Sequence, residues 1–142
     1  MADYWDTSCV IKLYCRESDS DTFLDKIAAA GEPVKSSSLV EAELFFAFQQ
    51  KWLRQETSGV TPESLFERFL SDVQLGRIQL FPLGADVIEE SRTVAHLCFT
   101  AMPVRPLRTL DGLHLATARL LACNRVITTD DRMKAAATLL GL

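Results

Sequence analysis

Hydrophobic and polar positions along the chain follow two different periods. Segments with apolar residues three or four positions apart predict helices, and short β-branched or aromatic runs predict strands. The expected strands are residues 4–5, 33–36, 78–83 and 125–129. The expected helices are residues 7–14, 21–30, 38–55, a segment that opens at Thr61, and residues 85–99, 109–123 and 132–140. Strands that alternate with helices favour an α/β fold, in which a parallel sheet is covered by helices on both faces.

Glycine and proline mark several of the expected boundaries. Gly31 ends the second helix as a natural C′ residue, and Thr61 followed by Pro62 has the pattern of a helix start. Two prolines, Pro103 and Pro106, indicate a loop over residues 103–107. No internal repeat, low-complexity tract or Pro/Gly-rich linker divides the sequence. We therefore expect one domain over residues 1–142, a length that suffices to bury a core.

Composition excludes several classes of protein. No apolar run reaches the roughly 18 residues that a membrane span requires. The first residues lack the basic stretch and the long apolar core of a secretory signal, so cytoplasmic residence is expected. The four cysteines are far apart and form no CxxC pair, so we expect buried thiols rather than a zinc site. An intramolecular disulfide is the alternative.

Charge is distributed unevenly along the chain. The net charge of −4 argues against a protein that coats nucleic acid by bulk electrostatics. Residues 1–104 hold 16 acids and 9 bases, whereas residues 105–142 hold 3 acids and 6 bases. A local basic region of this kind can contact phosphates, although scattered surface arginines give the same count.

Two aspartates, Asp6 and Asp130, directly follow predicted strands. Sites in parallel α/β folds collect outside the carboxyl ends of the strands, so these side chains are candidate site residues. Each also precedes a helix, and a helix cap is the simpler interpretation. Thr7 or Ser8 can cap the first of these helices, and Asp131 can cap the last. Both aspartates are therefore predicted to be free for another role.

Two further acids, Glu43 and Asp111, lie near helix starts. Thr109 or Asp111 can cap the helix that runs to about Cys123, and a cap or first-turn acid is the simpler interpretation of Asp111. If Thr109 is the cap, Asp111 is free for another role. Ser38 and Glu41 have the spacing of a capping box, which gives Glu41 a structural role and leaves Glu43 without one. Glu43 falls among apolar neighbours, so it must either reach water at the edge of the helix or meet a positive partner.

Four carboxylates brought close together would repel one another and raise one another's pKa values. Bound Mg²⁺ or Mn²⁺ removes this penalty, because both ions prefer oxygen ligands. Such an ion can activate water and stabilise charge on a phosphoryl oxygen. His114 lies one turn after Asp111; a buried core histidine is the favoured interpretation, and a general base is the alternative.

Five segments carry a resemblance to a known family. They are YWDTS at residues 4–8, SSLVEAEL at 37–44, RTLDGLHLATA at 108–118, ITTDDRM at 127–133 and the closing AAATLLGL. In order and spacing the chain resembles PIN-domain proteins, particularly VapC-like toxins of toxin–antitoxin pairs. Gly112 departs from the alanine that is common in the family.

The resemblance implies a three-layer α/β/α sandwich with a short parallel sheet and endonucleolytic cleavage of RNA. It implies that Asp6, Glu43, Asp111 and Asp130 are the metal-binding and catalytic acids, with Mg²⁺ or Mn²⁺ as cofactor. It also implies polar support from hydroxyls, for which the candidates are Thr7, Thr128 and Thr129. Family toxins generally dimerise and are inhibited by an antitoxin encoded beside them, so a homodimer and an antitoxin partner are expected.

Two questions stay open at this level. A PIN-like module that binds RNA or regulates without cutting it is the alternative to the enzyme. Receiver and haloacid-dehalogenase-like phosphatase domains fit poorly, because neither an acidic pair nor an Asp-x-Asp motif follows the first strand. Large apolar residues on two predicted helices cover more than one face of each helix. They are Phe45, Phe46, Phe48 and Trp52 on the first, and Phe66, Phe69 and Leu70 on the second. They can form core, a dimer surface or an antitoxin groove.

Overall fold

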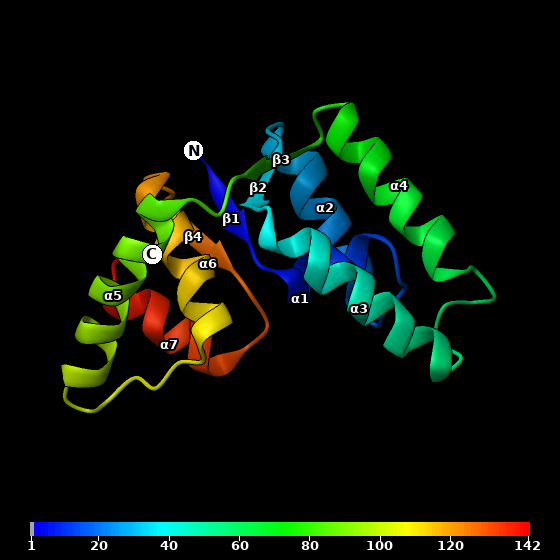
Figure 1. The fold of residues 1–142 in the computed structure, drawn as a ribbon. Helices are drawn as coiled ribbons and strands as arrows, with labels where there is room; N and C mark the ends of the chain where they lie inside the picture. The colour runs from blue at the N-terminus through cyan, green and yellow to red at the C-terminus, as the bar shows by residue number, and fades with distance from the viewer. Residues whose placement is uncertain (1) are drawn as a thin grey trace.

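A four-stranded parallel sheet lies at the centre of the computed structural model, which describes residues 2–142 (Figure 1). The strands are β1 (Asp3–Trp5), β2 (Val34–Ser37), β3 (Ile78–Phe81) and β4 (Arg125–Ile127), in the spatial order β3-β2-β1-β4. In β1, one of the two inner strands, Tyr4 is in register with Lys35 of β2 and Val126 of β4. β1 is followed in sequence by β2 on one side, whereas β4 pairs on the other side. A reversal of this kind opens a crevice at the carboxyl ends of β1 and β4.

The helices agree with the predicted segments to within a few residues. They are α1 (Thr7–Val10), α2 (Ser20–Ala30), α3 (Leu39–Leu53), α4 (Pro62–Gln74), α5 (Ala85–Thr100), α6 (Thr109–Leu120) and α7 (Asp131–Leu139). The helix predicted over residues 7–14 is divided, because its second half tightens into the 3₁₀ turn η1 (Ile11–Leu13). The α/β prediction is confirmed.

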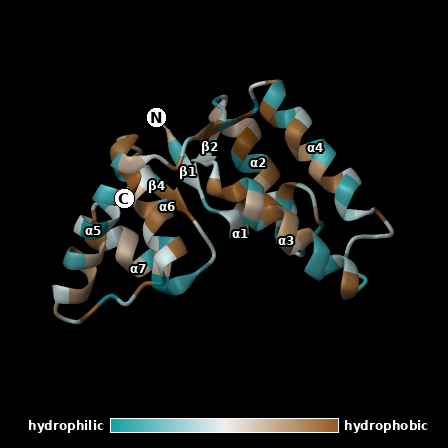
Figure 2. Ribbon diagram, viewed as in Figure 1, coloured by the Kyte–Doolittle hydropathy of each residue, from teal (hydrophilic) through white to brown (hydrophobic). Residues whose placement is uncertain are grey.

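Three clusters of buried hydrophobic residues lie on the two faces of the sheet. Neighbouring residues of a strand point to opposite faces, and Tyr4 and Trp5 accordingly belong to different clusters. On the Trp5 face, α2, α3 and α4 contribute buried side chains such as Phe48 and Phe69. On the other face, α5, α6 and α7 pack around residues that include Leu115 and Met133. Figure 2 shows polar turns along the outer helices α4 and α5 and more apolar ribbon near the sheet. The chain therefore has the three layers that were expected.

The predicted helix ends at Gly31 and Thr61 are correct, whereas the predicted capping box at Ser38 is wrong. Gly31 ends α2 in the left-handed region at φ 65°, and the Thr61 hydroxyl accepts a hydrogen bond from the Ser64 N–H at the start of α4. The Ser38–Glu41 capping box does not form. Ser38 Oγ instead accepts from the Leu83 N–H at 3.1 Å, because the Ser38 side chain faces the segment that follows β3.

The cysteines and the helix lengths test two further predictions. All four cysteines are free and buried, so the prediction of buried thiols is confirmed and no disulfide forms. Among residues 2–142, no helix combines the length and the apolar character needed to cross a bilayer.

Candidate metal centre

Asp6 lies immediately after β1 and is only 5 % exposed. Its Oδ1 accepts hydrogen bonds from Ser8 Oγ at 2.6 Å and from the Cys9 N–H at 3.3 Å, and its Oδ2 accepts from Thr128 Oγ1 at 2.6 Å. Burial raises the pKa of Asp6, and the bonds from Ser8 and Thr128 offset part of that rise. The prediction that Thr7 or Ser8 would replace Asp6 as the cap of α1 is wrong, because Ser8 donates to Asp6 instead.

Asp130 lies after β4 and caps α7. Its Oδ1 accepts from the Met133 N–H at 3.1 Å, so the predicted replacement of this cap by Asp131 is also wrong. Asp131 is the first helical residue and is exposed to solvent. Thr128 connects the two strand ends, since Oγ1 accepts from the Asp130 N–H at 3.1 Å while donating to Asp6.

Glu43 projects from α3 between two other elements. Its Oε1 accepts from Thr7 Oγ1 at 2.9 Å and lies 2.6 Å from His114 Nε2. Burial raises the pKa of Glu43, but the contacts with His114 and Thr7 outweigh burial, so the pKa is lowered. His114 thus gives Glu43 a hydrogen-bond partner, although not the positively charged one that the sequence suggested.

His114 is buried in α6, as the core interpretation of this histidine predicted. Its Nδ1 lies 2.6 Å from the hydroxyl oxygen of Tyr4 in β1. Burial raises the pKa of Tyr4 well above its usual range, so the phenol keeps its proton and can donate it to Nδ1. A histidine that accepts at Nδ1 carries its proton at Nε2, from which it donates to Glu43. His114 is therefore both a buried core residue and the partner of Glu43, a candidate site residue.

Asp111 lies in the first turn of α6 beside a residue that the sequence did not single out as a site residue. The predicted Thr109 cap is wrong, because Thr109 is the first helical residue and Arg108 is the N-cap, without a side-chain cap bond. Arg108 Nε lies 3.4 Å from Asp111 Oδ2, and Arg108 Nη2 lies 3.9 Å from Asp130 Oδ2. The available signal was the helical i,i+3 spacing of Arg108 and Asp111.

The four acids are connected around the carboxyl edge of the sheet, partly by side-chain contacts and partly by neighbouring positions in the chain. Glu43 is linked to Thr7, the residue after Asp6, and Asp6 is linked through Thr128 to Asp130. Arg108 connects Asp130 with Asp111. Asp111 and His114 lie one turn apart on α6, and His114 returns to Glu43. We call this arrangement the acidic ring.

The acidic ring suits an oxygen-liganded dication by the chemistry of its donors. Glu43 uses only Oε1 in hydrogen bonds among residues 2–142, so its Oε2 is available as a ligand. Within that described range, no three His, Cys, Asp or Glu side chains are already gathered around one point. Asp111 and Asp130 instead share the guanidinium of Arg108, which provides positive charge between them.

The fold and the acidic edge of its sheet define a class of protein that the comparisons identify. The PIN domain family model matches residues 4–139, so the chain belongs to the PIN domain family. The chain is also 34% identical over 143 residues to Ribonuclease VapC46 of Mycobacterium tuberculosis (strain ATCC 25618 / H37Rv). That similarity spans 99% of this chain and 94% of the relative. The family resemblance that the sequence motifs carried is confirmed.

Proposed function

We propose that this chain, acting as one domain, is a metal-dependent endoribonuclease of the VapC type. The observation that carries the proposal is the acidic ring, in which Asp6, Glu43, Asp111 and Asp130 are linked at the carboxyl edge of β1 and β4. The similarity to Ribonuclease VapC46 supports RNA as the substrate.

In this proposal the four acids hold Mg²⁺ or Mn²⁺, which supplies an activated water and positive charge for the phosphodiester when bound. The chain's own residues fix the geometry of the acids beforehand. Asp6 is held by three hydrogen bonds, and Glu43 is held through Oε1, which leaves its Oε2 without a hydrogen bond among residues 2–142. Side chains fixed in this way lose little freedom when a ligand binds.

Two of the three hydroxyls expected to support the acids contact them. Thr128 donates to Asp6, and Thr7 donates to Glu43 rather than to its neighbour Asp6. Thr129 contributes its backbone N–H, which donates to Ser8 Oγ at 3.3 Å. Partners of this outer layer orient metal ligands and raise metal affinity.

The proposal is tested by RNA cleavage with a matched pair of variants on α3. Purified protein is incubated with single-stranded and structured RNAs and Mg²⁺ or Mn²⁺, with and without EDTA. Glu43→Gln, or Asp6→Asn combined with Asp111→Asn, should abolish cleavage. Glu41→Gln, which changes an exposed glutamate on the same helix, should leave it intact. Cleavage that survives both EDTA and the double substitution overturns the proposed mechanism. Wild-type protein that binds RNA tightly without cutting it supports the RNA-binding module instead.

We propose further that the chain acts in the cytoplasm as the toxin of a toxin–antitoxin pair. Expression without a protein partner should then slow growth, and Glu43→Gln should relieve the effect at equal soluble expression. Normal growth at high soluble levels of wild-type protein would contradict the toxin role.

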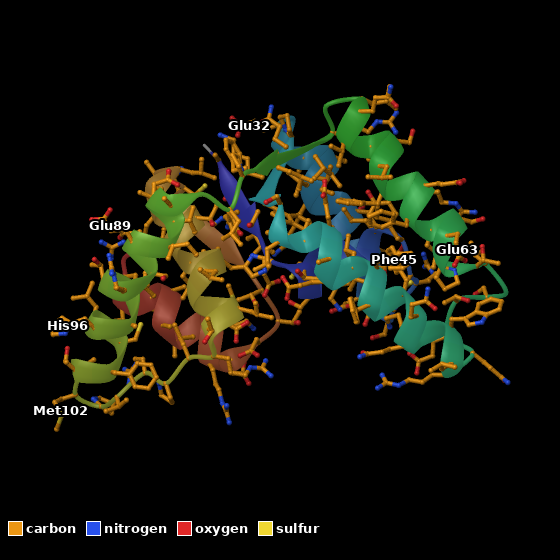
Figure 3. The ribbon with its side chains drawn as sticks, in the orientation of Figure 1. Glu32, Phe45, Glu63, Glu89, His96 and Met102 are labelled. Atoms are coloured by element: carbon orange, nitrogen blue, oxygen red, sulfur yellow. The ribbon has the colours of Figure 1, made fainter. Side chains whose placement is uncertain are left out.

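Exposed apolar side chains on α3 and α4 support a homodimer or a bound antitoxin. Phe46 is 70% exposed and Leu53 is 82% exposed, whereas Phe48 on the same helix is fully buried. Figure 3 shows Phe45 on the side of α3 nearer α4, where its ring lies 5.3 Å from that of Phe66. Sedimentation that finds only monomer at micromolar concentration would remove the homodimer proposal.

A further inference from the structure

Arg108 has a backbone fixed by a helical hydrogen bond and a side chain exposed to solvent. Its carbonyl accepts the first helical hydrogen bond of α6 from the Gly112 N–H at 3.0 Å, so its Cα is fixed at the helix start. Its side chain is 75% exposed. The guanidinium can therefore change its partners without any change in the fold.

The contacts of Arg108 with the two acids are long for charged groups. The nitrogen–oxygen distances are 3.4 Å to Asp111 and 3.9 Å to Asp130, whereas strong charge-assisted hydrogen bonds measure about 2.7–2.9 Å. Each acid receives a single nitrogen, so neither contact is the paired fork that makes arginine–carboxylate bridges strong. Contacts of this type are easily exchanged for better ones.

We propose that Arg108 is a phosphate-binding residue of the acidic ring, which offsets part of the negative charge of Asp111 and Asp130 until a divalent cation replaces it and then contacts the RNA backbone. This inference rests on the proposed metal-dependent ribonuclease function. The reason is that the Arg108 guanidinium and a divalent cation cannot both occupy the space between Asp111 and Asp130. The guanidinium now lies between two of the four proposed ligands, and a dication bound there would repel it.

A displaced guanidinium at this position suits a phosphodiester. It has five N–H donors in a planar arrangement that matches phosphate oxygens, and its positive charge complements theirs. Arg108 is the N-cap of α6, and Asp111 lies in the first turn of the same helix. The Arg108 guanidinium therefore stays near the acids even when it changes partners. The phosphate that it contacts would therefore be near the metal.

The first test measures metal binding without RNA. Mn²⁺ is titrated into wild-type, Arg108→Gln and Arg132→Gln protein, and free Mn²⁺ is quantified by its electron paramagnetic resonance signal. Arg132 is a matched control, because it is an exposed arginine in the first turn of α7 that forms no ion pair among residues 2–142. Arg108→Gln should bind Mn²⁺ about two- to fivefold more tightly than Arg132→Gln, the ratio that loss of a competing surface ion pair would give.

The second test measures RNA binding by fluorescence anisotropy in Ca²⁺ or in EDTA, with gels to check that the RNA stays intact. In EDTA the two variants should weaken binding equally, because each loses one surface charge. In Ca²⁺ the Arg108→Gln variant should weaken binding further. The slope of log affinity against log salt should also fall by about 0.7 for the lost phosphate contact.

The outcomes distinguish failure of the Arg108 role from failure of the metal-dependent ribonuclease function. Equal Mn²⁺ affinities for the two variants, or an RNA effect of Arg108→Gln that is the same in Ca²⁺ and EDTA, overturn the role of Arg108 alone. Wild-type protein that neither binds Mn²⁺ nor cleaves RNA overturns the proposed function and this inference together. Matching thermal melts of both variants and wild type exclude misfolding as a cause.

Discussion

His114 Nε2 lies 2.6 Å from Glu43 Oε1, across 71 positions of sequence. This contact joins α6 to α3 over the end of β1, and Tyr4 fixes the histidine from the other side. A partly buried carboxylate with such a partner is held in one orientation, and its lowered pKa keeps it ionised. The pair therefore links the stability of the fold to the orientation of Glu43, which we propose as a metal ligand.

Replacing His114 tests that link. His114→Ala should weaken Mn²⁺ binding by about 10- to 100-fold, the usual cost of losing a residue that orients a metal ligand. His96→Ala is the control, because His96 lies exposed on α5. The comparison is made by Mn²⁺ titration at a temperature where circular dichroism shows each variant to be folded. Unchanged affinity in folded His114→Ala protein would refute the positioning role.

Tyr4→Phe tests the outer end of the same network. The variant keeps the ring but removes the hydroxyl that lies 2.6 Å from His114 Nδ1, so a buried nitrogen loses its partner. The free energy of unfolding should fall by about 1–3 kcal/mol in urea denaturation. A change within about 0.5 kcal/mol, the range typical of surface substitutions, would mean that the bond is unimportant.

Asp6 should lower stability at neutral pH. Burial raises its folded pKa above the unfolded value of about 3.9, so its favourable contribution is complete below that pH and is lost as pH rises through the folded pKa. Asp6→Asn removes this penalty, and asparagine caps helices equally well. In EDTA the variant should therefore unfold at higher urea concentration than wild type at pH 7, and the difference should shrink toward pH 4. A difference that does not depend on pH would contradict this account.

Glu43 should act in the opposite sense. Burial alone raises its pKa, but His114 and Thr7 outweigh it, so the folded pKa lies below the unfolded value of about 4.3. Its stabilisation is present above that value and is lost as pH falls through the folded pKa. Glu43→Gln should be less stable than wild type at pH 7 in EDTA, with the deficit closing on acidification. A deficit that grows toward low pH would be the wrong sign.

Phe46 and Phe48 allow core and surface to be compared on one helix. Phe48 is fully buried, so Phe48→Ala should cost about 3–5 kcal/mol of unfolding free energy. Phe46 is 70% exposed, and Phe46→Ala should change stability by no more than about 0.5 kcal/mol. If α3 forms the dimer surface, the same exposed substitution should shift sedimentation toward monomer. Equal losses of stability would show that Phe46 belongs to the core.

Much of the fold could be predicted from local patterns. Strands and helices were found because β-branched runs, Gly31 and the Thr61–Pro62 start carry short-range signals. The placement of Asp6 and Asp130 at one edge followed from their positions after two parallel strands. The precise caps could not be inferred, because Ser8, Thr109 and Asp131 were equally plausible by type. Contacts with residues distant in sequence determine which side chain accepts hydrogen bonds from the free N–H groups at a helix start.

The partners of the acids could not be predicted in the same way. His114 and Glu43 are on different helices, and helical spacing reports only neighbours on the same helix. Arg108 looked like one of several scattered bases until the structure placed Asp130 beside it. Long-range contacts of this type depend on strand order, which the periods of hydrophobic residues do not encode.

The hydrogen bond from Thr128 to Asp6 spans 122 positions. The segment that follows β1 is thus held by the segment that follows β4, and β1 is paired with β4 along its full length. During synthesis, a chain that has grown past Asp111 but has not reached β4 lacks both Asp130 and the hydroxyl that holds Asp6. Assembly of the acidic ring must therefore wait until β4, the last strand of the sheet, has been made.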